Sequence, residues 1–168
     1  FKFLKATSRL AIKRWQYVGL VSHDIILGMA VIDISYVRSA FVYTYVRGDG
    51  RVRDHSFLDP LKRQTHFSSS SIEGMSSYES RGVSLKINNN VGSGARSASA
   101  WVKGQLEADF TFDEAQFSPL CAVTRNGLRG FNYCHKAAGV PVSGRIRVGG
   151  YLFELNAEST YGQIDWTA

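Results

Sequence analysis

Hydrophobic and polar side chains alternate along most of this chain, and this period of two is the feature that most restricts its fold. In residues 106–113, Leu, Ala, Phe and Phe alternate with Glu, Asp, Thr and Asp. Successive side chains of a β-strand point to opposite faces of a sheet, so the pattern predicts a strand with one buried and one wet face. The 3.6-residue period of a long amphipathic helix is not found, which favours a fold built of strands.

Glycine-rich turns separate the alternating runs. Gly48-Asp49-Gly50 predicts a hairpin between residues 41–47 and 51–57, and Gly149-Gly150 predicts a tight hairpin of the primed-turn type. Single helical turns are expected at 113–117 and 157–161, and a loop in the serine-rich stretch after residue 67. The candidate strands are 9–21, 25–37, 40–47, 51–57, 67–73, 82–88, 95–103, 105–112, 120–126, 131–137, 142–148 and 151–156.

Ten to twelve short strands joined by turns predict an all-β, antiparallel barrel or sandwich. Apolar residues make up 44% of the 168 residues, enough to build a core. We expect one domain over residues 1–168. The chain begins at Phe1 and stops in the middle of a pattern, so we interpret it as part of a longer protein.

Charge and cysteine content exclude several classes of protein. The net charge is +6, but the basic residues are spread out, so nucleic acid is not an expected partner. The longest apolar run, 25–34, is far shorter than the ~20 residues of a membrane helix and contains Asp33.

Cys121 and Cys134 are expected to be free thiols in a reducing compartment, such as the cytoplasm or an organelle interior. No metal-ligand or cofactor motif is present, so neither a metal nor a cofactor is predicted.

His135, Lys136 and Asp165 are the residues with the most chemical potential. On a strand, Tyr133, His135 and Ala137 share one face and Lys136 lies on the other. An inward His135 could hydrogen-bond a ligand or act as a general acid or base. The structural alternative is a histidine satisfied by neighbouring backbone or carboxylate groups.

Asp33 lies in an apolar strand, where an unpaired carboxylate is costly. Arg14, His135 or Lys136 could be its partner, and a structural ion pair is the simplest interpretation. Alternatively, Asp33 and Asp165 could protonate an alkene or activate water in a hydratase-like reaction.

Several aromatic residues could line an apolar pocket with polar handles. The proposed ligand contacts are Trp15, Tyr17, Tyr36 and Tyr133, with His135 and Asp33 as polar anchors. Aromatic residues also often fill a core, which is the alternative.

Four blocks of sequence carry a resemblance to a known family. They are Lys13-Arg14-Trp15-Gln16-Tyr17, residues 28–36, residues 133–144 and Ile164-Asp165-Trp166-Thr167. In this order they resemble the family of unknown function DUF2804. Members of this family look like relatives of the calycin or lipocalin-like group, which includes carotenoid hydratase-like proteins. The resemblance therefore implies a lipocalin-like barrel and concerns the fold alone.

Two functions remain open at this point. The first is a non-catalytic protein that binds a hydrophobic or amphipathic small molecule, or serves as a structural subunit with protein partners in a larger assembly. The second is a lyase or isomerase acting on an isoprenoid or lipid substrate. In the second, Asp33 or Asp165 donates a proton and His135 handles the water. A cavity in which Asp33, His135 and Asp165 converge would favour catalysis.

Overall fold

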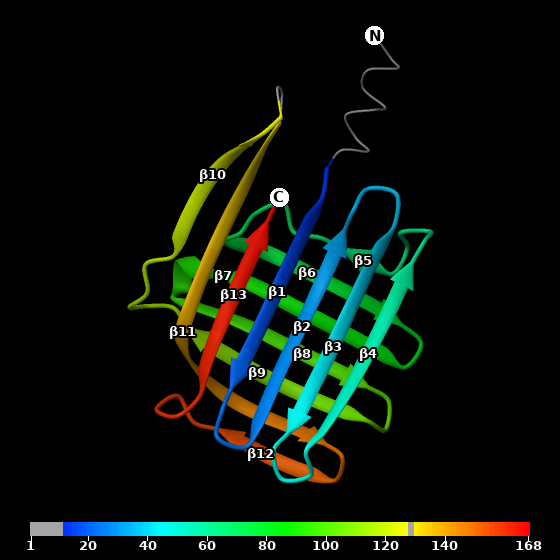
Figure 1. The fold of residues 1–168 in the computed structure, drawn as a ribbon, viewed down its shortest axis with the longest axis vertical. Helices are drawn as coiled ribbons and strands as arrows, with labels where there is room; N and C mark the ends of the chain where they lie inside the picture. Colours follow the sequence, from blue (N-terminus) through cyan, green and yellow to red (C-terminus); the bar gives the residue numbers. More distant parts are fainter. Residues whose placement is uncertain (1–11, 128–129) are drawn as a thin grey trace.

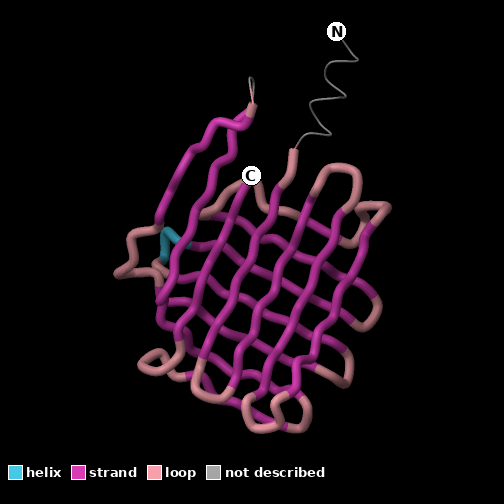
Figure 2. Tube along the Cα trace, in the orientation of Figure 1, coloured by secondary structure: helices cyan, strands magenta, loops and turns pink. Residues whose placement is uncertain are grey.

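The computed structural model describes residues 12–127 and 130–168, which form thirteen strands and one short 3-10 turn at Val91–Ser93. All strand pairs are antiparallel, and together they make a nearly closed barrel of two layers (Figure 1). The strands of the two layers cross one another, so the trace looks like a grid in Figure 2. The all-β, antiparallel fold class predicted from the alternation is confirmed.

The front layer of Figure 1 consists of six strands and the first half of a seventh, β11 (Gly130–Val148). The six are β1 (Arg14–Val21), β2 (Ile25–Asp33), β3 (Arg38–Val46), β4 (Arg51–Asp59), β10 (Leu120–Asn126) and β13 (Tyr161–Thr167). The back layer contains the second half of β11 and six further strands. These are β5 (Thr65–His66), β6 (Glu73–Ser80), β7 (Val83–Asn90), β8 (Ala95–Val102), β9 (Leu106–Asp113) and β12 (Tyr151–Leu155).

The long strand β11 joins the two layers. Its first half pairs with β10 and β13, and its second half pairs with β9 and β12. The sequence predicts two strands here, 131–137 and 142–148, separated by a Gly-Pro break. The structure instead has one strand with a bulge between Ala138 and Val140, where Gly139 adopts a φ of 76°. A bulge bends a strand without ending it, so the glycine redirects the chain instead of stopping it.

On the opposite side of the barrel, hydrogen bonds from side chains join the two layers. The order of paired strands ends at β4 on one side and at β5 on the other. The Asp59 carboxylate accepts hydrogen bonds from the backbone N–H groups of Arg63 and Gln64 in the connection between them and of Thr65, the first residue of β5. Arg38 of β3 donates to the Thr65 carbonyl at 2.7 Å, which ties the front layer to β5.

The inward side chains of both layers fill the interior as one large apolar cluster. Val18, Leu20, Leu27 and Met29 come from the front layer and meet Phe110 and Phe112 of β9. All are at most 1% exposed, and the two phenylalanine rings contact edge to face with centroids 5.6 Å apart. Side chains therefore occupy the space in which a lipocalin-like barrel could hold a ligand.

The serine-rich segment differs from the prediction. A strand was expected at 67–73, but the strand there is β6, Glu73–Ser80. Ser68 lies before it in a folded loop, where its hydroxyl donates to the carbonyls of Ser70 and Glu73 at 2.8 Å each. Serine hydroxyls compete with strand pairing by bonding to nearby backbone, which explains the shift.

Strand β13 was absent from the predicted set, although it lies in the middle of the front layer. A turn was expected at 157–161, and one forms just before the strand, with Thr160 N–H donating to the Asn156 carbonyl at 2.8 Å. In β13, Gly162, Ile164 and Trp166 then point inward. The small Gly162 weakens the hydrophobic alternation that would have revealed the strand. The start of the strand predicted at 9–21 lies outside the described residues.

Among the described residues, no helix is long and apolar enough to cross a membrane.

Gly162 offers a test of how tightly the interior is packed. A Cβ atom at this position would lie 2.3 Å from the Phe112 ring and 2.7 Å from Val142. We therefore expect Gly162→Ala to lower the free energy of unfolding by about 1–3 kcal/mol, the usual cost of overpacking a core. Urea denaturation measures it. The control is Gly48→Ala, since no heavy atom lies within 4 Å of that position. An equal loss in both variants would contradict tight packing at Gly162.

Candidate functional site

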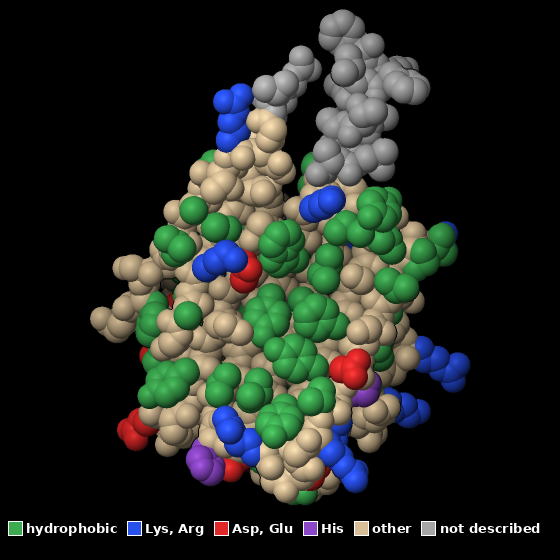
Figure 3. Space-filling view, in the orientation of Figure 1, with side chains coloured by type: hydrophobic (Ala, Val, Ile, Leu, Met, Phe, Trp, Pro, Cys, Tyr) green, Lys and Arg blue, Asp and Glu red, His purple; other side chains and the backbone are tan. Residues whose placement is uncertain are grey.

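Three aromatic side chains cover the middle of the outer face of the front layer. Tyr17 and Phe41 have ring centroids 6.5 Å apart, and Phe41 and Tyr43 have centroids 6.3 Å apart. The rings lie over glycines: a Cβ on Gly28 would come within 2.6 Å of the Tyr43 ring, and one on Gly19 within 2.5 Å of the Tyr17 hydroxyl. Glycine thus leaves room for rings that lie flat on the sheet. Figure 3 shows hydrophobic side chains gathered in the middle of this face.

The Tyr17 hydroxyl is the polar point of this aromatic surface. It lies 3.1 Å from the Tyr43 hydroxyl and accepts a hydrogen bond from Gln163 Nε2 at 3.2 Å. Burial and the hydrogen bond with Tyr43 raise the pKa of Tyr17 to about 12. Tyr17 is therefore a neutral hydrogen-bonding group at physiological pH and is not a general base.

A groove of about 420 Å³ lies beside the aromatic rings, near the start of β10. We call it the front groove; it is lined by Tyr17, Leu120, Lys136, Ala137, Ala138, Gln163, Ile164 and Asp165. Leu120 is 65% exposed and is the first residue of β10. The groove thus combines apolar side chains with a few polar groups, as ligand sites commonly do.

An ion pair forms the polar end of the front groove. Lys136 and Asp165 are directly opposite each other on β11 and β13, and Lys136 Nζ lies 2.7 Å from Asp165 Oδ2. Asp165 also accepts hydrogen bonds from Trp15 Nε1 at 3.3 Å and from the Thr167 hydroxyl at 2.8 Å. Since an ammonium group has three donors, Lys136 can hydrogen-bond a ligand without breaking this pair.

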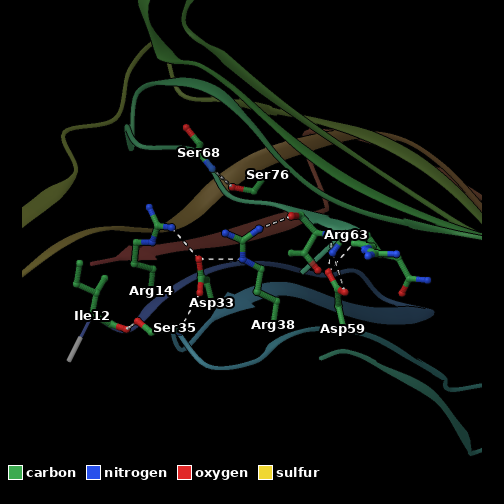
Figure 4. Close-up of polar contacts among 11 residues, drawn as sticks. Ile12, Arg14, Asp33, Ser35, Arg38, Asp59, Arg63, Ser68 and Ser76 are labelled. Carbon is green, nitrogen blue, oxygen red and sulfur yellow. Dashed lines mark hydrogen bonds and ion pairs between the residues drawn. The ribbon is translucent and has the colours of Figure 1, made fainter. Parts of the chain in front are cut away.

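Asp33 lies on the inner side of the front layer, at its edge (Figure 4). It is one of four charged residues opposite one another on β1 to β4: Arg14, Asp33, Arg38 and Asp59. Asp33 Oδ2 lies 2.7 Å from Arg14 Nη2 and 3.1 Å from Arg38 Nε. Burial raises the pKa of Asp33, but the hydrogen bonds from Arg14 and the Ser35 N–H outweigh this effect, so its pKa lies below the usual value. Asp33 is thus a paired carboxylate with no proton to donate at neutral pH.

His135 points into the interior and is only 1% exposed. Among the described residues, no hydrogen-bonding partner reaches either of its ring nitrogens. Burial lowers the pKa of His135, the positive charge of Arg96 lowers it further, and Glu114 partly opposes this. The imidazole is therefore neutral at physiological pH.

A buried polar network lies in the same interior and connects the two layers. Arg96 is fully buried and donates from Nε to Glu114 Oε1 at 2.7 Å and from Nη1 to Asn89 Oδ1. Gln16 of the front layer donates to Asn89 at 2.6 Å and accepts from the Ser76 hydroxyl at 2.7 Å. Both charges are thus hydrogen-bonded, as burial requires.

The family model of the domain of unknown function DUF2804 matches residues 2–168. The chain belongs to the DUF2804 family. Among curated proteins, none matches it significantly.

A solved structure shares the fold of this DUF2804 chain. It is the crystal structure of a candidate AttH protein from Nitrosomonas europaea, with a TM-score of 0.58 and 11% sequence identity. The similarity covers 92% of the DUF2804 chain and 50% of the Nitrosomonas protein, so the chain spans half the length of that protein. At this identity the likeness concerns the fold alone.

The three residues predicted to be catalytic do not lie together in this DUF2804 chain. Asp33 and His135 are inside the barrel, whereas Asp165 is on the outer face with Lys136. A single site containing all three is therefore not formed. The physical reason is the period of two: on β11, His135 and Lys136 point to opposite faces, and Asp165 pairs with Lys136.

The aromatic residues predicted to bind a ligand are also divided. Trp15 and Tyr17 lie on the outer face at or beside the front groove. Tyr36 is exposed in the connection between β2 and β3. Tyr133 packs edge to face against Trp166 with centroids 5.9 Å apart, and its hydroxyl donates to Cys121 Sγ at 3.4 Å.

Sequence reasoning missed the groove residues Leu120 and Gln163 and the buried Arg96. Leu120 and Gln163 reach the groove only through pairing of distant strands, for which the sequence has no local signal. Arg96 did have a local signal in the sequence. It alternates in phase with Ala98 and Ala100 and so belongs to the inward face of β8.

Within residues 12–127 and 130–168, no three or more His, Cys, Asp or Glu side chains gather in a way that could hold a metal ion. Cys121 and Cys134 are free thiols.

The buried His135 predicts a dependence of stability on pH. An unfolded chain protonates this imidazole near its ordinary pKa of 6.5, whereas the folded protein does so only at lower pH. The unfolded state therefore binds more protons below pH 6.5. The contribution of His135 to the free energy of unfolding is fully present above pH 6.5. Below that pH it falls, by at most about 1.4 kcal/mol per pH unit, until the lower pKa of the folded state is reached.

We expect His135→Leu to reduce the loss of unfolding free energy between pH 7.5 and 5.5, measured by urea denaturation. The matched control is His66→Leu at an exposed strand position, which should retain the wild-type loss. If His135→Leu and wild type lose the same amount, His135 does not titrate as its burial requires.

Proposed function

We propose that this DUF2804 domain is a non-catalytic binding protein that takes an apolar or amphipathic small molecule in the front groove. The observation that supports this most is the composition of the groove. An aliphatic wall, an aromatic ring and a charged pair meet in about 420 Å³ on the outer face, while core side chains fill the interior. Small-molecule sites are commonly apolar hollows with a few placed polar groups.

The groove suggests how such a ligand would lie. Its apolar body would pack against Leu120, Ala138 and the edge of the Tyr17 ring. Its polar end would accept a hydrogen bond from Lys136, whose ammonium group already faces the solvent side of the sheet. Gln163, held through its amide nitrogen by Tyr17, would offer its carbonyl oxygen as an acceptor.

The pairing of the two carboxylates favours binding over catalysis. A hydratase-like lyase needs a carboxylic acid that is still protonated near neutral pH. The pKa of Asp33 is lowered by its arginine partners, and Asp165 is held by Lys136, Trp15 and Thr167. These two carboxylates also lie on opposite faces of the front layer, so the lyase or isomerase alternative receives no support from their arrangement.

The test is a pair of matched substitutions. Leu120→Ser removes the aliphatic wall of the front groove, and Leu152→Ser makes the same change at a 55% exposed position on β12. We expect decanol, decanoic acid or geraniol to bind the wild-type protein in isothermal titration calorimetry. Leu120→Ser should weaken binding about tenfold or more, since burying a leucine side chain contributes roughly 1.5–3 kcal/mol and about 1.4 kcal/mol is a factor of ten. Leu152→Ser should leave binding unchanged.

Mass spectrometry of an organic extract of the purified protein supplies a second readout. A co-purifying apolar compound that is lost from Leu120→Ser would support the proposal. It would be contradicted if none of the three probes bound and the extract contained no such compound, or if both variants weakened binding equally.

A further inference from the structure

The outer face of the back layer has a different chemistry from that of the front layer. Its side chains form two neighbouring rows that run across β7, β8, β9, β11 and β12, because the residues in each row are directly paired from strand to strand. The first row is Ser84, Trp101, Glu107, Arg147 and Leu152, and the second is Lys86, Ser99, Asp109, Arg145 and Glu154. Nearly every member can donate or accept a hydrogen bond.

This face is hollowed along the rows. Three shallow hollows of about 370, 500 and 280 Å³ lie on it, and Asp109 lines all three. They extend from Met75 on β6 to Leu152 on β12. We call them together the back groove. Since strands are about 4.8 Å apart, the five strands of the two rows span roughly 19 Å, which suits an elongated ligand.

Trp101 is the one large aromatic side chain of the two rows. It is 42% exposed and lines the 370 Å³ hollow together with Glu107 and Arg147. An indole ring on a sheet surface is flat and rigid, so it can stack against an apolar ligand face at little cost in conformational entropy. Charged and hydroxyl groups surround it, so a ligand that stacks here also needs many hydrogen-bonding groups.

The charges in the rows cancel. Arg145 and Arg147 stand beside three acidic residues, Glu107, Asp109 and Glu154, and Arg147 lies 3.7 Å from Glu107. The remaining basic residue, Lys86, pairs with Glu79 of β6 at 2.9 Å. A nucleic acid or another polyanion binds best where positive charge is in excess, which is not so in these rows despite the chain's net charge of +6. The back groove therefore favours an uncharged ligand that is polar at its edges.

We propose that the back groove binds a neutral oligosaccharide. The C–H face of one sugar ring would stack on Trp101, as uncharged sugars stack on flat aromatic rings. Sugar hydroxyls both donate and accept, so they would hydrogen-bond to the carboxylates of Glu107 and Asp109 and to the guanidinium groups of Arg145 and Arg147. This site is on the opposite layer from the front groove and does not depend on the function proposed for it.

The experiment is a titration followed by NMR, in which the indole N–H signals of the tryptophans report separately. The probes are maltohexaose, cellohexaose and chitohexaose, with a heparin hexasaccharide as the charged comparison. At least one neutral probe should shift the Trp101 signal and leave that of Trp15 in place. Trp101→Ala should weaken binding about tenfold or more, and Asp109→Asn should also weaken it. Trp15→Ala, on the front layer, should not.

Trp101 and Asp109 are exposed, so their variants are expected to fold, and the dispersion of the amide spectrum checks this. Three results would overturn the proposal. One is the absence of any Trp101 shift with all three neutral probes at millimolar concentration. Another is tighter binding of the heparin fragment, which would make the face a polyanion site. The last is equal loss in Trp101→Ala and Trp15→Ala.

Discussion

The rest of the structure depends on the hydrogen bonding of one strand, β11. Its first half is paired with β10 and β13 in the front layer, and its second half with β9 and β12 in the back layer. Because β11 continues as a single strand through the bulge at Gly139 and is paired on both sides of it, the layers form one sheet folded onto itself. That folding encloses the core, sets which side chains face outward, and places residues distant in sequence beside one another at the front groove.

Buried polar side chains form a second connection between the two layers, besides the backbone of β11. Arg96 and Glu114 are buried together, and Asn89 and Gln16 extend the network from the back layer to the front. A buried ion pair seldom adds much stability compared with apolar side chains, but breaking one is costly. The network therefore acts against any other arrangement of the two layers, because a shifted front layer would separate the buried Gln16 amide from Asn89 and Ser76. The row of Arg14, Asp33, Arg38 and Asp59 likewise favours the observed arrangement. Arg38 and Asp59 of the front layer both hydrogen-bond to Thr65 of β5.

Two outer faces of one sheet thus present different chemistry. The front layer shows aromatic rings lying over glycines beside a groove with one ion pair, and the back layer shows balanced charges around Trp101. With the interior filled, both proposed sites lie outside the barrel, which distinguishes this domain from a barrel that encloses its ligand. A protein with an apolar site on one layer and a polar site on the other could hold two ligands at once.

The alternation of side chains in the sequence by itself determined the fold class, most strand positions and the hairpins at Gly48-Asp49-Gly50 and Gly149-Gly150. It also determined that His135 and Lys136 face opposite ways, because the period of two is a local property of a strand. Only the tertiary structure decided which face is the inner one. Pairing between distant strands placed Asp165 with Lys136 and put Asp33 between two arginines. Those contacts depend on sheet register, which no short stretch of sequence specifies.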